Sequence, residues 1–320
     1  MTRRGPEPLP LDRYRDRIAL DEPFRPAAPP APPDQLGPLA SAALRVLATD
    51  RAVARLGSTP DQVRAAAEGP SARAVLDDLL TVRDPGPLPE EAVPLLDALL
   101  GGERASRPLM DPSALLPLSS AAEETVFPPA AQVVLWRGDI TALAVDAVVN
   151  AANARLLGCW QPGHACIDHA IHRAAGPRIR GDCHTITVLQ GGPEPTGTAK
   201  VTRGYHLPAG FVLHTVGPVV PGSVTPDDER LLASAYRSCL DLASAIEPVR
   251  TVALCSISTG AFGYPKGRAA PVALGAVASW CQENPDRFDR IVFDVFSPAD
   301  EATYLDAIRG WTVPATGTDS

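Results

Sequence analysis

The sequence predicts an α/β protein with a central sheet, preceded by an all-α region. Between residues 36 and 102, apolar residues recur at helical spacing and no strand pattern occurs. From residue 132 onward, short apolar runs rich in β-branched residues alternate with longer amphipathic segments, as in an α/β domain. The chain has 320 residues and is 45% hydrophobic, which is enough for one large domain with an appendage.

Composition divides the chain into five segments. Prolines dominate the first segment and are frequent again in the third, where a short helix near Ala114 is expected. The expected segments are a disordered Pro-rich tail (1–35), a helical extension (36–102), a linker (103–130), the α/β domain (131–312) and a flexible C-terminus (313–320).

Capping signals place two helix starts within the helical extension. Thr59, Pro60 and Asp61 give a cap, a proline at the first helical position and an acid after it. Pro89–Glu91 opens a later helix that Gly101 and Gly102 are expected to end, and Pro94 leaves its start uncertain or kinked. We find no residues suited to chemistry in this region.

The α/β domain follows a regular order of strands and helices. Buried strands are predicted where β-branched residues run together, and helices where apolar residues recur every three or four positions. The predicted strands are 133–136, 145–149, 200–202, 211–216, 249–257 and 290–296, and the predicted helices are 167–174, 227–245, 269–281 and 301–308.

Charge and composition exclude several classes of protein. A net charge of −8 argues against nucleic acid as the main partner, because phosphate binding needs a basic face. No apolar run reaches the roughly 18–20 residues of a membrane span, and no apolar segment follows the basic N-terminus as in a secretory signal. We therefore expect a soluble cytoplasmic protein without a membrane partner.

Two of the six cysteines belong to a loop that is unusual for its chemistry. Cys159, His164 and Cys166 lie within eight residues, directly before a predicted helix. Two thiolates and an imidazole are natural ligands for Zn²⁺, and three protein ligands would leave one position for water or substrate. The alternative is a purely structural metal clip. The other cysteines, predicted to be small buried residues, are Cys183, Cys239, Cys255 and Cys281.

Polar and glycine-rich loops follow several predicted strands, where open α/β sheets bind ligands. Gly260 and Gly263 lie in a turn that leads into a helix, which suits either an anion cradle or a plain tight turn. Asp139 could accept a hydrogen bond from an exocyclic amine or cap a short helix. Phe296 could stack on a base or fill the core.

Together these motifs resemble the macrodomain, the ADP-ribose-binding module, over residues 131 to about 310. The resemblance rests on five segments in the family's order and spacing, namely 138–141, 148–153, 197–208, 214–218 and 258–265. Where other macrodomains continue into a run of glycines, this chain has the cysteine–histidine segment 158–168, which is similar to the zinc-dependent microbial branch. That branch also carries a helical N-terminal extension.

The resemblance implies a three-layer sandwich around a mixed sheet, with a set of ligand-binding residues. Asp139 and Ile140 would hold the adenine, Phe296 would line its pocket, and Asn153 would bind the distal ribose. Cys159, His164 and Cys166 would ligate zinc beside that ribose. The residues expected around the diphosphate and distal ribose are Ser258, Thr259, Gly260, Ala261, Phe262 and Gly263.

The activity implied by the resemblance is zinc-dependent removal of mono-ADP-ribose from proteins, at acidic side chains. Asn153 and Asp168 are the candidate catalytic residues, although Asp168 could instead be a first-turn helix acid. His169 and His172 are either zinc-supporting groups or solvated helix residues. Two other functions remain open: an ADP-ribose-binding module with structural zinc, and an O-acetyl-ADP-ribose deacetylase.

Overall fold

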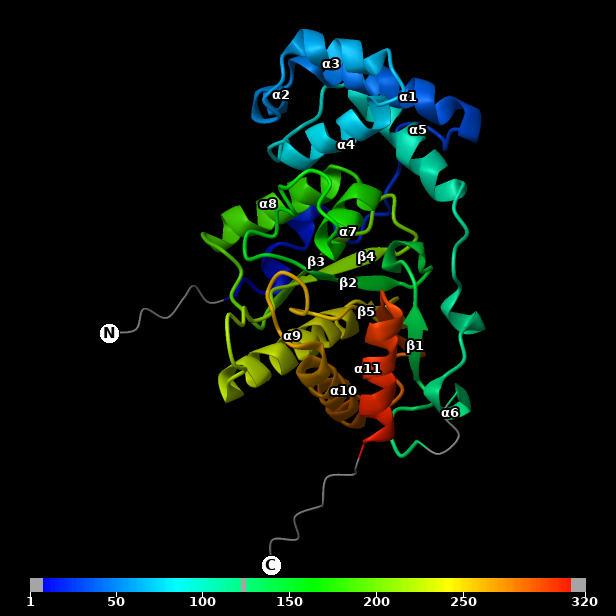
Figure 1. Cartoon of the computed structure of the whole chain (residues 1–320), viewed down its shortest axis with the longest axis vertical. Helices are drawn as coiled ribbons and strands as arrows, with labels where there is room; N and C mark the ends of the chain where they lie inside the picture. Colours follow the sequence, from blue (N-terminus) through cyan, green and yellow to red (C-terminus); the bar gives the residue numbers. More distant parts are fainter. Residues whose placement is uncertain (1–7, 122–124, 312–320) are drawn as a thin grey trace, which may run out of the picture. The chain divides into compact units, whose positions relative to one another are not determined.

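The computed structural model describes residues 8–121 and 125–311 (Figure 1). The chain groups into two compact units. The first contains residues up to 109 together with 152–195 and 201–212, and the second contains 110–151, 196–200 and the chain from 213 onward. The predicted C-terminal segment 313–320 lies outside the described residues, and the predicted domain limits stay predictions.

The N-terminal region is helical, as expected. Thr59 caps a helix through a capping box with Gln62, which confirms the predicted start. One apolar core runs through these helices, with Leu44, Leu76 and Leu79 fully buried. The helices are α1 (Pro33–Val46), the 3-10 turn η3 (Leu47–Thr49), α2 (Ala52–Arg55), α3 (Pro60–Ala67), α4 (Ala72–Val82) and α5 (Ala92–Ala105).

The predicted end of α5 at Gly101 and Gly102 is wrong, because the helix continues to Ala105. A Cβ at Gly102 would lie 2.4 Å from the carbonyl oxygen of Ala31. The amide of Ala31 in turn donates to the carbonyl of Ala98 at 3.0 Å. These glycines therefore allow another segment of backbone to cross the helix closely rather than ending it.

The segment that crosses α5 belongs to the Pro-rich tail, which was expected to be disordered. Residues 8–32 instead hold two 3-10 turns, η1 (Leu11–Arg13) and η2 (Asp16–Ile18). Tyr14 is fully buried, and its hydroxyl accepts a hydrogen bond from the amide of Val201 at 3.1 Å. A few large apolar side chains among the prolines anchor this segment, which composition alone did not reveal. Residues 1–7 lie outside the described residues.

The linker is also partly ordered. It contains the predicted short helix at Ala114 as the 3-10 turn η4 (Pro112–Ala114), and a helix α6 (Leu118–Ala121). The amide of Met110 donates to the carbonyl of Ala142 at 2.9 Å, so this end of the linker is held by backbone pairing.

A six-stranded sheet forms the centre of the α/β region, with strand order β1-β6-β5-β2-β4-β3. Neighbouring pairs β1–β6, β6–β5 and β5–β2 are parallel. β3 and β4 form a hairpin, because the amide of Gly204 donates to the carbonyl of Gly210 and that of Gly197 to the carbonyl of Val216. The strands are β1 (Val133–Arg137), β2 (Ala147–Ala151), β3 (Ala199–Arg203), β4 (Phe211–Thr215), β5 (Thr251–Leu254) and β6 (Arg290–Val295).

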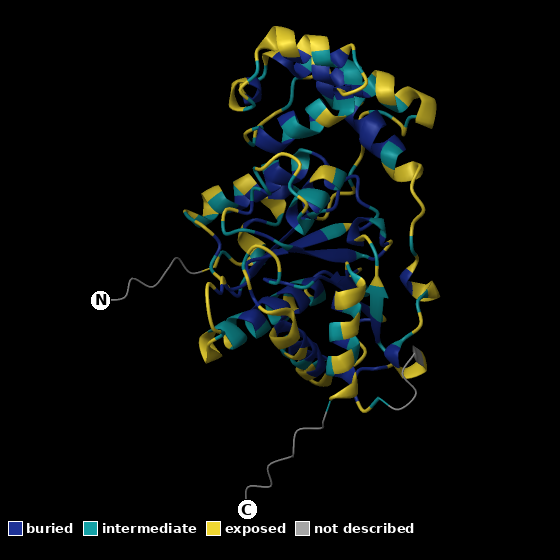
Figure 2. Ribbon diagram, viewed as in Figure 1, coloured by how far each residue is buried: buried dark blue, intermediate teal, exposed yellow. Residues whose placement is uncertain are grey.

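The central strands are buried, as their continuous apolar runs predict (Figure 2). The predicted strand at 145–149 begins later, at Ala147, because Asp146 has another role. Its carboxylate accepts hydrogen bonds from the amides of Arg250 and Thr251 at 2.8 and 2.7 Å. Asp146 thus fixes the start of β5 beside β2.

Three helices pack on one face of the sheet: α9 (Pro226–Ser244), α10 (Lys266–Glu283) and α11 (Pro298–Arg309) (Figure 1). Phe293 of β6 contacts the rings of Tyr236 and Tyr304 at 6.5 and 5.3 Å between centroids. The predicted α/β class with a mixed sheet and an N-terminal all-α region is confirmed. Among the described residues, no helix combines the length and apolarity that crossing a bilayer requires.

Two further helices belong to the first unit. α7 (Ile167–Ala175) was predicted, and Gly176 ends it with a φ of 89°. α8 (Arg178–Gln190) was not predicted, because its polar and β-branched residues show no clear apolar stripe.

Candidate functional site

The cysteine–histidine loop lies directly before α7. Gly158 and Gly163 adopt φ values of 77° and 67°, which only glycine adopts freely. The amide of Cys166 donates to the carbonyl of His164 at 2.9 Å, and the Cys166 sulfur accepts from the amide of His169 at 3.4 Å as the N-cap of α7. The loop is therefore folded against the helix start.

The three predicted metal ligands come together in this loop. One potential ligand atom from each of Cys159, His164 and Cys166 lies within 4.8 Å of the others, and the Cys159 sulfur is 3.4 Å from His164 Nδ1. Zinc bonds of about 2.0–2.3 Å in a tetrahedron place ligand atoms roughly 3.3–3.8 Å apart. The donor set and the distance between Cys159 and His164 thus fit zinc. Burial raises the pKa of the Cys166 thiol to about 12 when no cation is bound.

Asn153 and Asp168 are brought together beside the same loop. Asn153 Nδ2 donates to the carbonyl of Gly158 at 3.0 Å and lies 3.4 Å from Asp168 Oδ2. Asp168 is a first-turn acid of α7, as the alternative predicted, but it is buried, so a favourable interaction with the helix dipole alone does not explain it. Its second oxygen lies 3.5 Å from Nε2 of His172.

The two helix histidines differ in their surroundings. His172 is buried, so its alternative reading as a solvated residue is wrong. Its ring packs so closely that a Cβ on Gly158 would lie 2.8 Å from Nδ1. His169 is partly buried, and that burial lowers its pKa.

In the second unit, Asp139 follows β1 and caps the short turn η5 (Ile140–Ala142). Its carboxylate accepts from the amide and hydroxyl of Thr141 at 2.9 and 2.7 Å. Asp139 itself is exposed while Ile140 is buried. The predicted helix-cap role of Asp139 is therefore confirmed. Its exposed carboxylate can still accept a hydrogen bond from a ligand.

The loop after β5 forms a tight turn that leads to α10. Ser258 adopts a φ of 66°, unusual for a residue with a side chain, and Gly263 one of 74°. The amide of Tyr264 donates to the carbonyl of Ser258 at 3.0 Å, and the amide of Gly263 to that of Gly260 at 3.0 Å. Gly260 and Ala261 are exposed, Thr259 and Phe262 are half-buried, and α10 begins without a side-chain cap. This geometry is compatible with both predicted roles of the loop, a plain tight turn and a cradle for an anion.

Phe296 follows β6 and is 82% exposed, so its alternative reading as a core aromatic is wrong. An exposed ring at a strand end can stack on a flat ligand.

Sequence reasoning missed several residues around these groups. Trp160 follows a predicted ligand but was not singled out, and its neighbour Arg180 lies on the unpredicted α8. Asp294 is buried in the middle of an apolar strand pattern. Burial, with help from the charge of Asp139, raises the pKa of Asp294 to about 8. The position of Asp294 within an apolar run was the one signal in the sequence that could have drawn attention to it.

The comparisons with known proteins agree with these features. The Macro domain family matches residues 149–273. A protein-ADP-ribose hydrolase of Treponema medium is 52% identical over 53% of this chain, which spans 64% of that relative. A protein-ADP-ribose hydrolase of Staphylococcus aureus is 40% identical over 72% of this chain and 82% of the relative. The ADP-ribose glycohydrolase MACROD2 of Xenopus laevis is 46% identical over 54% of this chain and 39% of the relative.

Solved structures give the same result for the fold. The Trypanosoma brucei macrodomain in complex with ADP-ribose matches 70% of this chain and 92% of its own, at 31% identity and a TM-score of 0.56. The same macrodomain in complex with ADP matches 64% of this chain and 78% of its own, at 34% identity and a TM-score of 0.54. The chain belongs to the macrodomain family.

Proposed function

We propose that this protein is a zinc-dependent hydrolase that removes mono-ADP-ribose from modified proteins. The observation that carries the proposal is the convergence of Cys159, His164 and Cys166 within 4.8 Å in a loop to which Asn153 also donates a hydrogen bond. The relatives named protein-ADP-ribose hydrolase support the choice of reaction.

In this proposal the second unit holds the ADP-ribose. The exposed carboxylate of Asp139 accepts from the adenine amine, while the amide of Ile140 donates to the ring and Phe296 stacks on it. The turn from Ser258 to Gly263 presents backbone amides to the diphosphate, and the uncapped start of α10 adds its positive dipole end.

The cysteine–histidine loop acts on the distal ribose in this proposal. Zinc, when bound by the three ligands, supplies a Lewis acid that polarises a ribose or ester oxygen or activates a water. Two thiolates cancel the charge of the cation, so orientation of the ribose is the larger contribution. Asn153 positions the ribose hydroxyls, and Asp168 is the proposed base that takes the proton of the attacking water.

The bond to an acidic side chain and the cytoplasmic location are further parts of the proposal. An ester on the distal ribose is the bond that a polarised oxygen and a carboxylate base cleave readily. All six cysteines are free thiols, which suits a reducing compartment in which Cys159 and Cys166 stay available as ligands.

The test combines metal analysis with a hydrolysis assay before and after chelation. We expect about one equivalent of zinc, as for a single three-ligand site, and loss of turnover on an ADP-ribosylated protein when the zinc is removed. The double variant Cys159→Ala, His164→Ala should lose turnover and keep ADP-ribose binding, whereas Cys281→Ala should match the wild type. Full activity without metal would exclude the zinc mechanism.

The same assays separate the other two functions. Zinc-bound wild-type protein that binds ADP-ribose without releasing it from any modified protein would be a binding module. Faster turnover of O-acetyl-ADP-ribose than of an ADP-ribosylated acidic protein would indicate the deacetylase.

A further inference from the structure

Trp160 follows Cys159 directly and faces two arginines. The guanidinium carbon of Arg55, at the end of α2, lies 5.3 Å from the centre of the indole, and that of Arg180, on α8, lies 5.0 Å from it. A guanidinium over the face of tryptophan is attracted by the negative charge of the ring face. The residue next to a proposed zinc ligand is thus held from the N-terminal helices and from α8.

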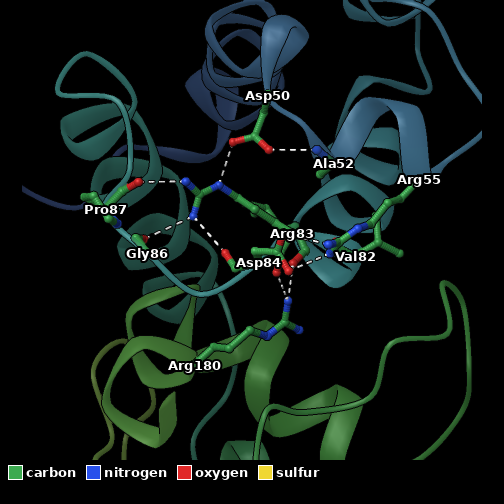
Figure 3. A network of polar contacts seen from close by, with 10 residues as sticks. Asp50, Ala52, Arg55, Val82, Arg83, Asp84, Gly86, Pro87 and Arg180 are labelled. Atoms are coloured by element: carbon green, nitrogen blue, oxygen red, sulfur yellow. Dashed lines mark hydrogen bonds and ion pairs between the residues drawn. The ribbon is translucent and has the colours of Figure 1, made fainter. Parts of the chain in front are cut away.

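Both arginines also bind the end of α4 (Figure 3). Arg55 donates to the carbonyl of Val82 at 3.1 Å and to the carboxylate of Asp84 at 2.6 and 2.8 Å. Arg180 donates to the carbonyls of Leu80 and Arg83 at 2.9 and 2.7 Å. The last carbonyls of a helix lack partners within the helix and carry the negative end of its dipole, so cations are favoured there. We call Trp160, Arg55, Arg180 and residues 80–84 the Trp160 cluster.

Arg180 is fixed more firmly than a surface arginine. It is only 6% exposed, and burial lowers its pKa. A desolvated guanidinium strengthens both its hydrogen bonds and its interaction with an aromatic ring. The cavity lined by Cys159, His169 and Arg180 has a volume of about 30 Å³, so the helices pack closely against the loop.

The same helix α4 reaches the other flank of the loop. The carboxylate of Asp77 accepts from Arg173 Nε at 2.7 Å and lies 3.9 Å from His169 Nε2. His169 is the residue whose amide donates to the Cys166 sulfur. α4 therefore contacts His169 beside Cys166 directly, and it binds the two arginines that hold Trp160 beside Cys159.

We propose that Trp160, Arg55 and Arg180 are positioning residues for the metal loop, and that the N-terminal helical region is therefore part of the metal site. The inference rests on the proposed function in that it takes the loop to bind zinc. In this arrangement the helices hold Cys159 in its ligating position before the metal arrives. Zinc affinity, and the rigidity of the metal-free loop, both depend on the cluster.

The experiment uses the full chain, four single variants and the double variant Trp160→Ala, Arg55→Ala. Trp160→Ala removes the ring, Trp160→Phe keeps an aromatic face, Arg55→Ala removes one cation, and Arg45→Ala is the matched control. Arg45 forms an exposed ion pair with Glu68 in the same helical region. Zinc affinity is measured by competition with a chromogenic chelator, and hydrogen exchange of residues 155–166 is measured on metal-free protein.

We expect Trp160→Ala to weaken zinc binding by about tenfold or more, as is typical when a group that supports a metal ligand is lost. Exchange in the loop should accelerate in parallel. Trp160→Phe and Arg45→Ala should stay close to the wild type, and Arg55→Ala should fall between. Because Arg55 and Trp160 act as one unit, the double variant should lose less than the sum of the two single losses.

The outcomes separate the two proposals. If Trp160→Ala and Arg55→Ala leave zinc affinity and loop exchange unchanged, the positioning inference is overturned. If Trp160→Ala does not fold, Arg55→Ala compared with Arg45→Ala decides the same question. If the wild type binds no zinc, the proposed function fails, and accelerated exchange in Trp160→Ala would still show that the cluster orders the loop.

Discussion

Gly217 and Ser258 meet at a point in the second unit where no side chain fits. A Cβ on Gly217 would lie 2.0 Å from the Ser258 hydroxyl oxygen and 2.5 Å from the side chain of Ile257. Ser258 is buried and already holds a positive φ of 66°. The conformation of the proposed diphosphate loop therefore depends on the missing side chain at Gly217.

We expect Gly217→Ala to weaken ADP-ribose binding by about tenfold. Overpacking costs about 1–3 kcal/mol, and 1.4 kcal/mol corresponds to a factor of ten in affinity. Titration calorimetry measures the effect, and Gly222→Ala is the control, because a Cβ there would meet nothing within 4 Å. Equal affinities for the two variants would show that the loop does not depend on this contact.

Asp294 makes stability depend on pH. Its pKa is raised to about 8 by burial and by the nearby charge of Asp139, whereas an unfolded chain has an aspartate pKa near 3.9. The native state thus holds this proton more tightly than the unfolded state. The free energy of unfolding must then fall as pH rises from about 4 through about 8.

Asp294→Asn should remove that decline. The gain in melting temperature of the variant over the wild type should be small at pH 5, grow through pH 7 and level off above pH 8. Thermal melts at these pH values measure it. A difference that does not change with pH would mean that the carboxyl does not titrate in this range.

At the scale of elements, Asp97 of α5 joins four parts of the first unit. Its fully buried carboxylate accepts from Arg178 at 2.5 and 2.9 Å and from the amide of Ala27 at 2.7 Å, and it lies 3.0 Å from His206 Nε2. Burial alone would raise the pKa of Asp97, but the partners outweigh it and hold the pKa well below its usual range. Arg178 also lies over the ring of Phe24 at 5.2 Å.

We expect Asp97→Asn to lower the free energy of unfolding by about 3 kcal/mol, because it leaves the charge of Arg178 unpaired. Urea unfolding followed by circular dichroism measures the change. Asp61→Asn is the control, since the Asp61 side chain is 92% exposed and forms an ion pair with Arg64 on its own helix. That variant should stay within about 0.5 kcal/mol, and an equally small loss at Asp97 would contradict the role given to the buried pair.

Elements with strong local signals were predictable, and those set by tertiary contacts were not. Thr59 and Pro60 predicted the start of α3, and runs of β-branched residues predicted the six strands. The prediction that α5 ends at Gly101 and Gly102 was wrong, because glycine is used both at helix ends and where another backbone crosses a helix closely. α8 was missed because its buried residues include Arg180 and Asp182, which break the apolar stripe.

At the scale of the whole molecule, motif spacing predicted the metal-ligand residues, but it did not predict the residues that pack around their loop. Cys159, His164 and Cys166 were predicted as one group, and their ligand atoms converge. Nothing near Trp160 in the sequence points to Arg55, which is more than 100 positions away, because such a pair is defined only by the fold. Likewise, nothing in the Pro-rich tail predicted that the hydroxyl of Tyr14 would accept a hydrogen bond from the distant Val201.

Zinc should therefore stabilise more than its own loop. The loop is tied to α7 through the Cys166 cap and to the N-terminal helices through Trp160, so a ligand that binds only the folded loop stabilises the native chain by mass action. We expect the melting temperature to rise with added zinc, by an amount equivalent to about 2.7 kcal/mol at a hundredfold excess over Kd.

Scanning calorimetry with increasing zinc measures this, and Cys159→Ala is the matched comparison. The variant should lose the dependence on zinc while still gaining stability from ADP-ribose, because the residues proposed for adenine and diphosphate do not include Cys159. A zinc dependence that persists in Cys159→Ala would place the stabilising metal elsewhere in the chain. A wild type that melts at the same temperature with and without zinc would show that zinc does not bind the native chain in preference to the unfolded chain.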